Sequence, residues 1–247
     1  MSAHTNDLII FWFVVGLRVF VPLLIPRFPL LAGIAAMIID AVDQTVYQRY
    51  TTMNLDFYQG YDKALDVYYL SIEYISVMLN WTNVFAFKTV RFLFFYRLFG
   101  TFLFELLQIR ALLLIFTNAF EYVFLAIEAI RTHWDIRKMP TKLMLGITAF
   151  IWVVIKLPQE YWIHIAKLDF TDAVQDHTGL AVVAFALLGV VLVVAYRIIT
   201  PKVPTSDWKL RFDANAHDRR VTQAQIDEAR MALAHKFFDS ELLEKVV

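Results

Sequence analysis

The chain of 247 residues has no cysteine, only seven glycines, and no surplus of charge of either sign. The absence of cysteine excludes disulfide bonds, iron–sulfur clusters and zinc sites built from thiolates. With so few glycines, we expect no glycine-rich loop of the kind that cradles phosphate groups. Lys plus Arg and Asp plus Glu number 23 each, so no net charge attracts the chain to nucleic acid, and we expect no nucleic-acid partner.

Apolar residues are in excess instead: they make up 59% of the chain, against 19% for charged residues. A soluble globular domain has about 45–50% apolar and about 25% charged residues, so a soluble enzyme is excluded. The apolar residues gather into seven segments, and stretches of roughly 18 or more such residues are typical of transmembrane helices. The segments are residues 8–25, 29–50, 61–80, 89–107, 111–130, 143–157 and 179–199. The sequence therefore predicts an all-α polytopic transmembrane helix bundle over residues 1–199, with about seven spans, or six if the fourth and fifth segments form one bent helix.

The remaining residues, 200–247, are polar enough to predict a soluble tail with a linker and one amphipathic helix. After a capping box, apolar residues recur at helical spacing, namely Ile226, Leu233, Phe237 and Leu242. A single helix cannot bury such a stripe by itself, so we expect it to contact a partner protein, the membrane surface or the rest of the chain.

Basic residues in the short loops predict the orientation. Residues 131–142 carry four Lys or Arg, and four more occur in residues 197–211 at the start of the tail. Loops rich in Lys and Arg face the cytoplasm. We therefore expect a multi-pass protein of the cell membrane, with its N-terminus outside and its C-terminus in the cytoplasm.

Two pairs of aspartates occur on consecutive apolar segments. Asp40 and Asp43 share one helical face at spacing i, i+3, and Asp62 and Asp66 share another at spacing i, i+4. Because the connection between the segments is short, we expect the two pairs to face each other. Four converging carboxylates repel one another unless they hold a divalent cation or share protons. The alternative is that they are solvated or paired with nearby basic side chains.

This pattern resembles the signature of the CDP-alcohol phosphatidyltransferases, in which Asp-x2-Asp-Gly-x2-Ala-Arg is followed, after eight residues, by Gly-x3-Asp-x3-Asp. The family's four aspartates bind two divalent metals. The resemblance implies that Asp40, Asp43 and Asp62 are ligands of Mg²⁺ or Mn²⁺ and that Asp66 is the base that acts on the acceptor hydroxyl. It covers residues 40–66. The chain departs from the signature by Gln44 in place of glycine and by one inserted residue before Asp62.

Further charged residues lie within or at the ends of the apolar segments: Arg97, Glu105, Glu121, Glu128 and Arg131. Charge at membrane depth is costly, so we expect these side chains to pair with one another or with a partner subunit. Glu128 and Arg131 are spaced i, i+3, and Arg97 needs Glu105 or Glu121 as its partner. These carboxylates are either structural ion pairs or the proton pathway of a transporter.

Three functional hypotheses follow. The first is a non-catalytic accessory subunit of a larger membrane complex, one that handles or transports lipids, with membrane lipids and other membrane subunits as partners and no cofactor. It rests on the departures from the enzyme signature, on the charges that need partners and on the apolar stripe of the tail. The second is a divergent, metal-dependent CDP-alcohol phosphotransferase of phospholipid synthesis, which needs Mg²⁺ or Mn²⁺. The third is a proton-coupled carrier.

Overall fold

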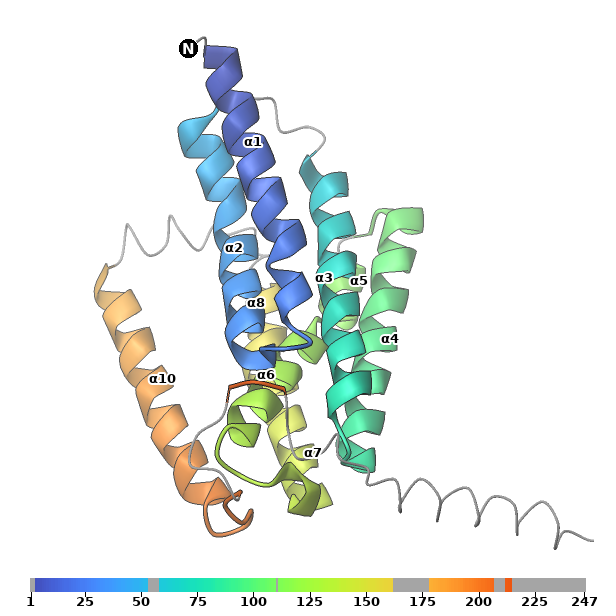
Figure 1. Cartoon of the computed structure of the whole chain (residues 1–247), viewed down its shortest axis with the longest axis vertical. Helices are drawn as coiled ribbons and strands as arrows, with labels where there is room; N and C mark the ends of the chain where they lie inside the picture. Colours follow the sequence, from blue (N-terminus) through green and yellow to red (C-terminus); the bar gives the residue numbers. More distant parts are fainter. Residues whose placement is uncertain (1–2, 53–57, 110, 162–177, 207–211, 215–247) are drawn as a thin grey trace, which may run out of the picture. The chain divides into compact units, whose positions relative to one another are not determined.

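Helices make up nearly all of the secondary structure, so the all-α prediction is confirmed (Figure 1). The computed structural model describes residues 3–52, 58–109, 111–161, 178–206 and 212–214. The helices are α1 (Ala3–Phe20), η1 (Pro22–Leu24), α2 (Pro29–Tyr50), α3 (Tyr58–Asn80), α4 (Val84–Leu107), α5 (Ala111–Ile115), α6 (Ala119–Arg131), η2 (Ile136–Lys138), α7 (Thr141–Phe150), η3 (Ile151–Lys156), α8 (Leu157–Glu160) and α10 (Thr178–Ile199). Within these ranges there is no β-strand, and one isolated β-bridge joins Trp134 to Thr205.

Four helical stretches are long and apolar enough to cross a membrane: Thr5–Leu24, Pro29–Tyr50, Ala111–Arg131 and Thr141–Glu160. Helices α3 and α4 have 23 and 24 residues, which is also sufficient length, but both carry several charged side chains. Four stretches are thus compatible with membrane spans, and the full count of seven stays a prediction.

The chain divides by its internal contacts into Met1–Ala214 and Asn215–Val247. The second unit lies outside the described residues, and so do the tail residues predicted to bind a partner, Ile226, Leu233, Phe237 and Leu242. Residues 200–206, between α10 and this boundary, belong to the first unit, and Val203 is buried in its core.

Local chemistry sets the ends of α4 and separates it from the next helix. At its start, the Asn83 side chain accepts hydrogen bonds from the backbone N–H groups of Phe85 and Ala86, as a helix N-cap does. At its end, Gln108 adopts the left-handed conformation with φ 56°, and this turns the chain away from the helix axis. The fourth and fifth apolar segments therefore do not form one bent helix.

The fifth and sixth apolar segments are both irregular. The fifth is divided into α5 and α6 by a break at residues 116–118. The sixth is continuous from Thr141 to Glu160 but contains the π-helical turn η3 just before Pro158. Proline has no backbone N–H and cannot donate to the preceding turn, so the helix rearranges there instead of ending.

Helix α6 lies at the centre of the bundle and packs against α2, α3, α4 and α7 (Figure 1). Phe120 and Phe124 of α6 are fully buried. Phe120 packs edge-to-face on Phe94 of α4, which in turn stacks on Tyr74 of α3 at 4.5 Å between ring centroids. Contacts between large rings thus join these helices, in place of the small residues that pack many membrane bundles.

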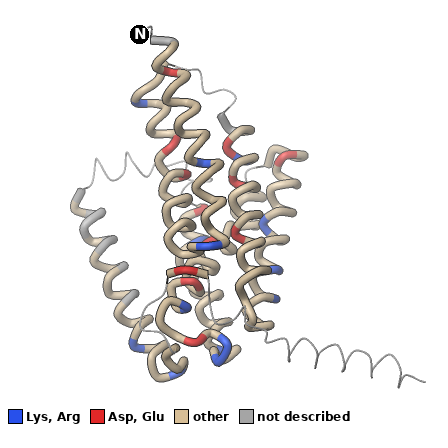
Figure 2. Tube along the Cα trace, viewed as in Figure 1, with Lys and Arg blue, Asp and Glu red and all other residues tan. Residues whose placement is uncertain are grey.

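The outer surface of the bundle is rich in large apolar side chains. Trp12 and Phe13 of α1 are each 65% exposed, and Phe92 and Phe102 of α4 are more than half exposed. Such faces are unfavourable in water and suit contact with lipid. Charged residues, by contrast, occur along the helices as well as at their ends (Figure 2).

We predict that Gly100→Ala destabilises the bundle by about 1–3 kcal/mol, the usual cost of overpacking. A Cβ atom at Gly100 would lie 2.0 Å from Cβ of Phe116, so α4 and the chain before α6 would have to move apart. Thermal unfolding in detergent, followed by circular dichroism, measures the effect.

The matched control is Gly146→Ala in α7, where nothing lies within 4 Å of the added Cβ. Alanine in a helix interior is favoured over glycine by about 0.5–1 kcal/mol, so this variant should be as stable as the wild type or more so. Equal unfolding temperatures for the two variants would contradict the close packing at Gly100.

Candidate cation-binding site

The four aspartates predicted from the sequence converge on one side chain, Arg18 of α1. Helices α1 and α2 form an antiparallel pair joined by η1. Arg18 lies near the end of α1, and Asp40 lies in the middle of α2. The ion pair between them shows that they lie side by side along the pair.

The Arg18 guanidinium donates hydrogen bonds to all four carboxylates, two from each neighbouring helix. On α2 it donates through Nη2 to Asp40 and through Nη1 to Oδ2 of Asp43 at 2.5 Å. On α3 it donates through Nη1 to Oδ1 of Asp62 at 2.6 Å and through Nη2 to Oδ1 of Asp66 at 3.1 Å. We call Arg18 and these four residues the aspartate cluster. It joins α1, α2 and α3 by charge-assisted hydrogen bonds.

The members of the aspartate cluster differ in exposure. The side chains of Arg18 and Asp43 are 4% and 0% exposed, whereas Asp40, Asp62 and Asp66 are 38%, 30% and 30% exposed. The inner pair is therefore shielded from solvent, and the other three carboxylates form an open acidic face. An incoming cation or ligand has access to that face only.

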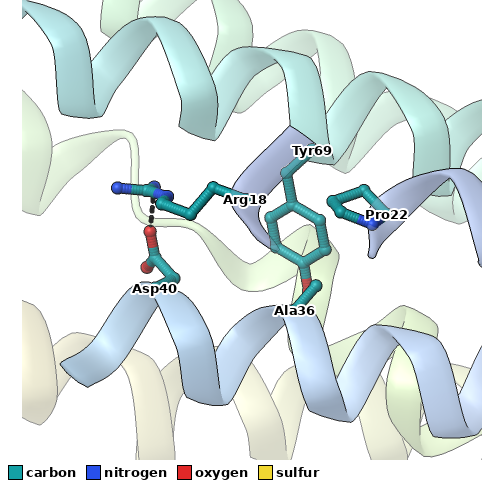
Figure 3. A pocket seen from close by; sticks show the side chains of 5 residues that line it. All are labelled: Arg18, Pro22, Ala36, Asp40 and Tyr69. Carbon is teal, nitrogen blue, oxygen red and sulfur yellow. Dashed lines mark hydrogen bonds and ion pairs between the residues drawn. The ribbon is translucent and has the colours of Figure 1, made fainter. Parts of the chain in front are cut away.

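A small cavity adjoins the aspartate cluster and has space for about one water molecule. Its lining residues are Arg18, Pro22, Ala36, Asp40 and Tyr69 (Figure 3). In Figure 3 the Tyr69 ring stands between Arg18 and Pro22, and its hydroxyl points toward Ala36. Tyr69 thus lines the cavity beside the aspartate cluster with its ring.

The donor set of the aspartate cluster fits a divalent cation. Ligand oxygens of Asp40, Asp62 and Asp66 lie within 4.8 Å of one another. Mg²⁺ takes oxygen ligands at about 2.1 Å, so oxygens on opposite sides of one ion are roughly 4.2 Å apart. These three carboxylates could hold such an ion with small side-chain movements. Asp43 is turned toward Arg18 and supplies its buried counter-charge.

Aromatic residues flank the aspartate cluster. Tyr47 of α2 is buried, and its hydroxyl lies 3.4 Å from the hydroxyl of Tyr61 on α3. The ring of Phe11 on α1 packs against both tyrosines, with centroids 5.9 Å and 5.8 Å away. Tyr47 stands where the family signature has alanine, so the chain carries a much larger side chain at this position.

The sequence-predicted charges of α6 are paired inside the chain. Glu128 accepts hydrogen bonds at Oε1 from Arg131, at 3.1 Å, and from the indole N–H of Trp81, at 2.6 Å. Glu121 accepts hydrogen bonds from the Tyr69 hydroxyl at 3.0 Å and from the Asn118 amide at 2.8 Å.

Arg97 and Glu105 do not pair with each other. Arg97 donates to the backbone carbonyl of Phe116 at 3.1 Å. Glu105 instead forms an ion pair with Lys63 of α3 at 3.2 Å. Residues eight apart on one helix are about 12 Å apart along its axis, which is too far for a direct ion pair. Lys63 is consequently engaged with Glu105 and is not the cation that compensates the aspartates.

Sequence reasoning missed three residues of this region. Arg18 was visible as a basic residue inside an apolar segment, but its spacing does not place it beside Asp40, because the turn between α1 and α2 is not centred on Pro29. Tyr69 and Glu73 follow Asp66 on the same helix, but nothing in their spacing indicates that both are buried. Their positions become clear only once α6 is packed against α3.

We predict that Arg18→Gln destabilises the protein by about 3–5 kcal/mol in the presence of a chelator, since it leaves Asp43 buried without its counter-charge. Adding Asp43→Asn to this variant should restore part of the loss. Thermal unfolding in detergent measures both effects. The control is Arg91→Gln, at an exposed position of α4. If Arg18→Gln cost no more than Arg91→Gln, the guanidinium would not hold the cluster together.

The chain was also compared with known proteins: no known family, no curated protein and no solved structure matches it. The similarity to the CDP-alcohol phosphatidyltransferases therefore rests on residues 40–66 alone and stays an expectation from the sequence.

Proposed function

We propose that this chain is a membrane-embedded, divalent-cation-dependent enzyme whose reaction is the one that the resemblance implies, phosphotransfer from a CDP-linked alcohol to an acceptor hydroxyl. The convergence of Asp40, Asp43, Asp62 and Asp66 on one point carries this proposal. The same four residues are those that the resemblance assigns to metal binding and to the base.

Charge supports a cation at this point. Four ionised carboxylates and one guanidinium leave a formal charge of −3 on the aspartate cluster. Like charges at such short range cannot all stay ionised without compensation, and they take up protons or a cation. The open face of Asp40, Asp62 and Asp66 is made of the oxygen donors that Mg²⁺ and Mn²⁺ prefer.

The residues have distinct roles in this proposal. Asp40 and Asp62 would hold Mg²⁺ or Mn²⁺, which when bound withdraws charge from the phosphates of the substrate. Arg18 and Asp43 orient the outer carboxylates from the buried side. Asp66 accepts the proton of the acceptor hydroxyl, whose oxygen then bonds to the phosphorus that carries the alcohol. The bond between the two phosphates breaks and CMP leaves.

The accessory-subunit hypothesis loses one of its supports. It rested in part on charges that need a partner protein, yet Glu128, Arg131, Glu105 and Lys63 have partners within the described chain. What favours it is the guanidinium of Arg18, which already lies among the aspartates, together with the small size of the adjoining cavity. We retain it as the second candidate, with membrane lipids and other membrane subunits as its partners.

The exposed apolar faces of α1 and α4 support a location in a membrane. That this is the cell membrane, with the N-terminus outside, remains a proposal from the loop charges. The proton-coupled carrier, the third hypothesis, gains no support from Glu128, since Arg131 and Trp81 engage it.

We expect the purified protein to bind Mn²⁺. The Asp62→Asn variant should bind it at least about 10–100-fold more weakly, because even the loss of a residue that only supports a ligand weakens metal binding by this much. Electron paramagnetic resonance of Mn²⁺ titrated into the detergent-solubilised protein measures the affinity. Asp135→Asn is the control, because Asp135 pairs with Arg137 in the loop after α6, outside the cluster. Equal Mn²⁺ affinities in all three proteins would exclude the cation site.

For the reaction, the protein in lipid vesicles should release CMP from CDP-diacylglycerol when Mg²⁺ and a soluble alcohol are added. Asp66→Asn should lower the rate by about 10²–10⁴-fold, the usual contribution of a general base. Mn²⁺ binding without CMP release from any CDP-alcohol would exclude the reaction and keep the cation site. Absence of both, with stoichiometric partner proteins after mild purification, would favour the accessory subunit.

A further inference from the structure

Glu73 of α3 is a buried carboxyl group without a counter-charge. Its side chain is fully buried, and neither of its oxygens accepts a hydrogen bond of normal geometry from the described residues, although the group interacts with the nearby Tyr69 hydroxyl. It lies beside α2, where Oε1 would be 3.6 Å from a Cβ atom at Gly33. Transfer of an ionised carboxylate from water to such a place is very unfavourable, and the group takes a proton instead.

A second carboxyl group lies close to Glu73 across the helix interface. Glu121 of α6 is also buried, and Tyr69, one turn before Glu73 on α3, donates its hydroxyl to Oε1 of Glu121 at 3.0 Å. The Asn118 amide donates to Oε2 of Glu121 at 2.8 Å. Both donors stabilise a negative charge on Glu121. The pair therefore has one carboxyl group with two hydrogen-bond donors, Glu121, and one that accepts no hydrogen bond of normal geometry, Glu73.

The surrounding charges do not compensate Glu73. The titratable groups that face it are Tyr69, Glu121 and Glu128. Glu128 is engaged by Arg131 and Trp81. The charged groups that act on Glu121 from other elements are Lys156, Asp40 and Arg97. Lys156 is itself paired with Glu160 at 3.2 Å, and Arg97 donates to a backbone carbonyl.

Tyr69 connects this pair to the exterior. Its ring lines the cavity beside Arg18, and its hydroxyl is bonded to Glu121 (Figure 3). A hydroxyl both donates and accepts hydrogen bonds, so it can pass a proton between a water molecule in the cavity and a carboxyl group behind it.

We propose that Glu73, Tyr69 and Glu121 form a buried proton-binding site, in which Glu73 is a carboxylic acid at neutral pH and exchanges its proton through Tyr69 with the cavity beside Arg18. The ligand of this site is a proton. The site does not depend on the phosphotransfer proposed above and would be present in either candidate function. It gives the bundle a place to store a proton next to a cluster whose net charge changes when a cation binds.

The test uses the full chain in lipid vesicles and dicyclohexylcarbodiimide, which modifies protonated carboxyl groups in apolar surroundings. The acid oxygen adds to the carbodiimide carbon, the acid proton passes to nitrogen, and an acyl shift gives a stable acylurea from which nothing leaves. Peptide mass spectrometry should find the adduct on Glu73. Glu128 is the matched control, because it is buried in the same bundle but ion-paired.

We expect modification of Glu73 to exceed that of Glu128 on the order of tenfold or more, because the protonated fraction of a carboxyl group falls tenfold for each pH unit above its pKa. Equal or greater modification of Glu128 would overturn the proposal. Infrared spectroscopy gives a measurement that needs no reagent. The wild type should show a carboxylic-acid C=O band that shifts in D2O and is lost in Glu73→Gln. Retention of that band in a folded Glu73→Gln protein would also overturn the proposal.

The role of Tyr69 is tested by Tyr69→Phe, which keeps the ring and removes the hydroxyl. In this variant the D2O shift of the Glu73 band should be slower than in the wild type. An unchanged rate would remove Tyr69 from the exchange path. Tyr68→Phe is the control, since the Tyr68 hydroxyl donates to the Val19 carbonyl and has no contact with Glu121.

Discussion

One guanidinium among four carboxylates fixes the arrangement of the first three helices. Arginine cannot lose its proton under any condition that the protein meets, so Arg18 remains positive at all times. Its buried position requires negative partners, and the described neighbours that meet this need are the aspartates of α2 and α3. A shift of either helix by one turn would leave a buried charge without compensation. The register of α1, α2 and α3 therefore follows from electrostatics as much as from packing.

The acidic residues buried in the bundle have two different kinds of surroundings. Glu128 has a cation and an indole N–H, and it is a structural ion pair at the end of α6. Glu73 has neither, although it is equally remote from solvent. The difference comes from the basic residues that are near each of them. Arg131 follows Glu128 by one turn, and no basic residue of α3 or α6 stands in that relation to Glu73.

Sequence patterns predicted the structural features that are set within one helix, or between two helices joined by a short connection. The apolar runs located the helices, and the spacing of Asp40 with Asp43 and of Asp62 with Asp66 placed each pair on one face. The partner of the aspartates escaped prediction because it depends on how η1 turns α1 back along α2. Likewise, Arg97 was expected to meet Glu105 or Glu121, but its spacing from Glu105 on α4 holds these two apart, and Lys63 of α3 pairs with Glu105 instead. Contacts between helices distant in sequence depend on packing that no local pattern encodes.

The isolated bridge between Trp134 and Thr205 has a consequence for where the membrane-embedded part can be cut. The backbone N–H of Asp135 donates to the Pro204 carbonyl, and that of Ser206 donates to the His133 carbonyl, each within 3.0 Å. The polar segment after α10 thereby completes the loop that leaves the central helix α6. A protein shortened to the end of α10 would lose both hydrogen bonds. It would also expose the apolar surface that the buried Val203 side chain covers, so a minimal bundle has to extend past Ser206.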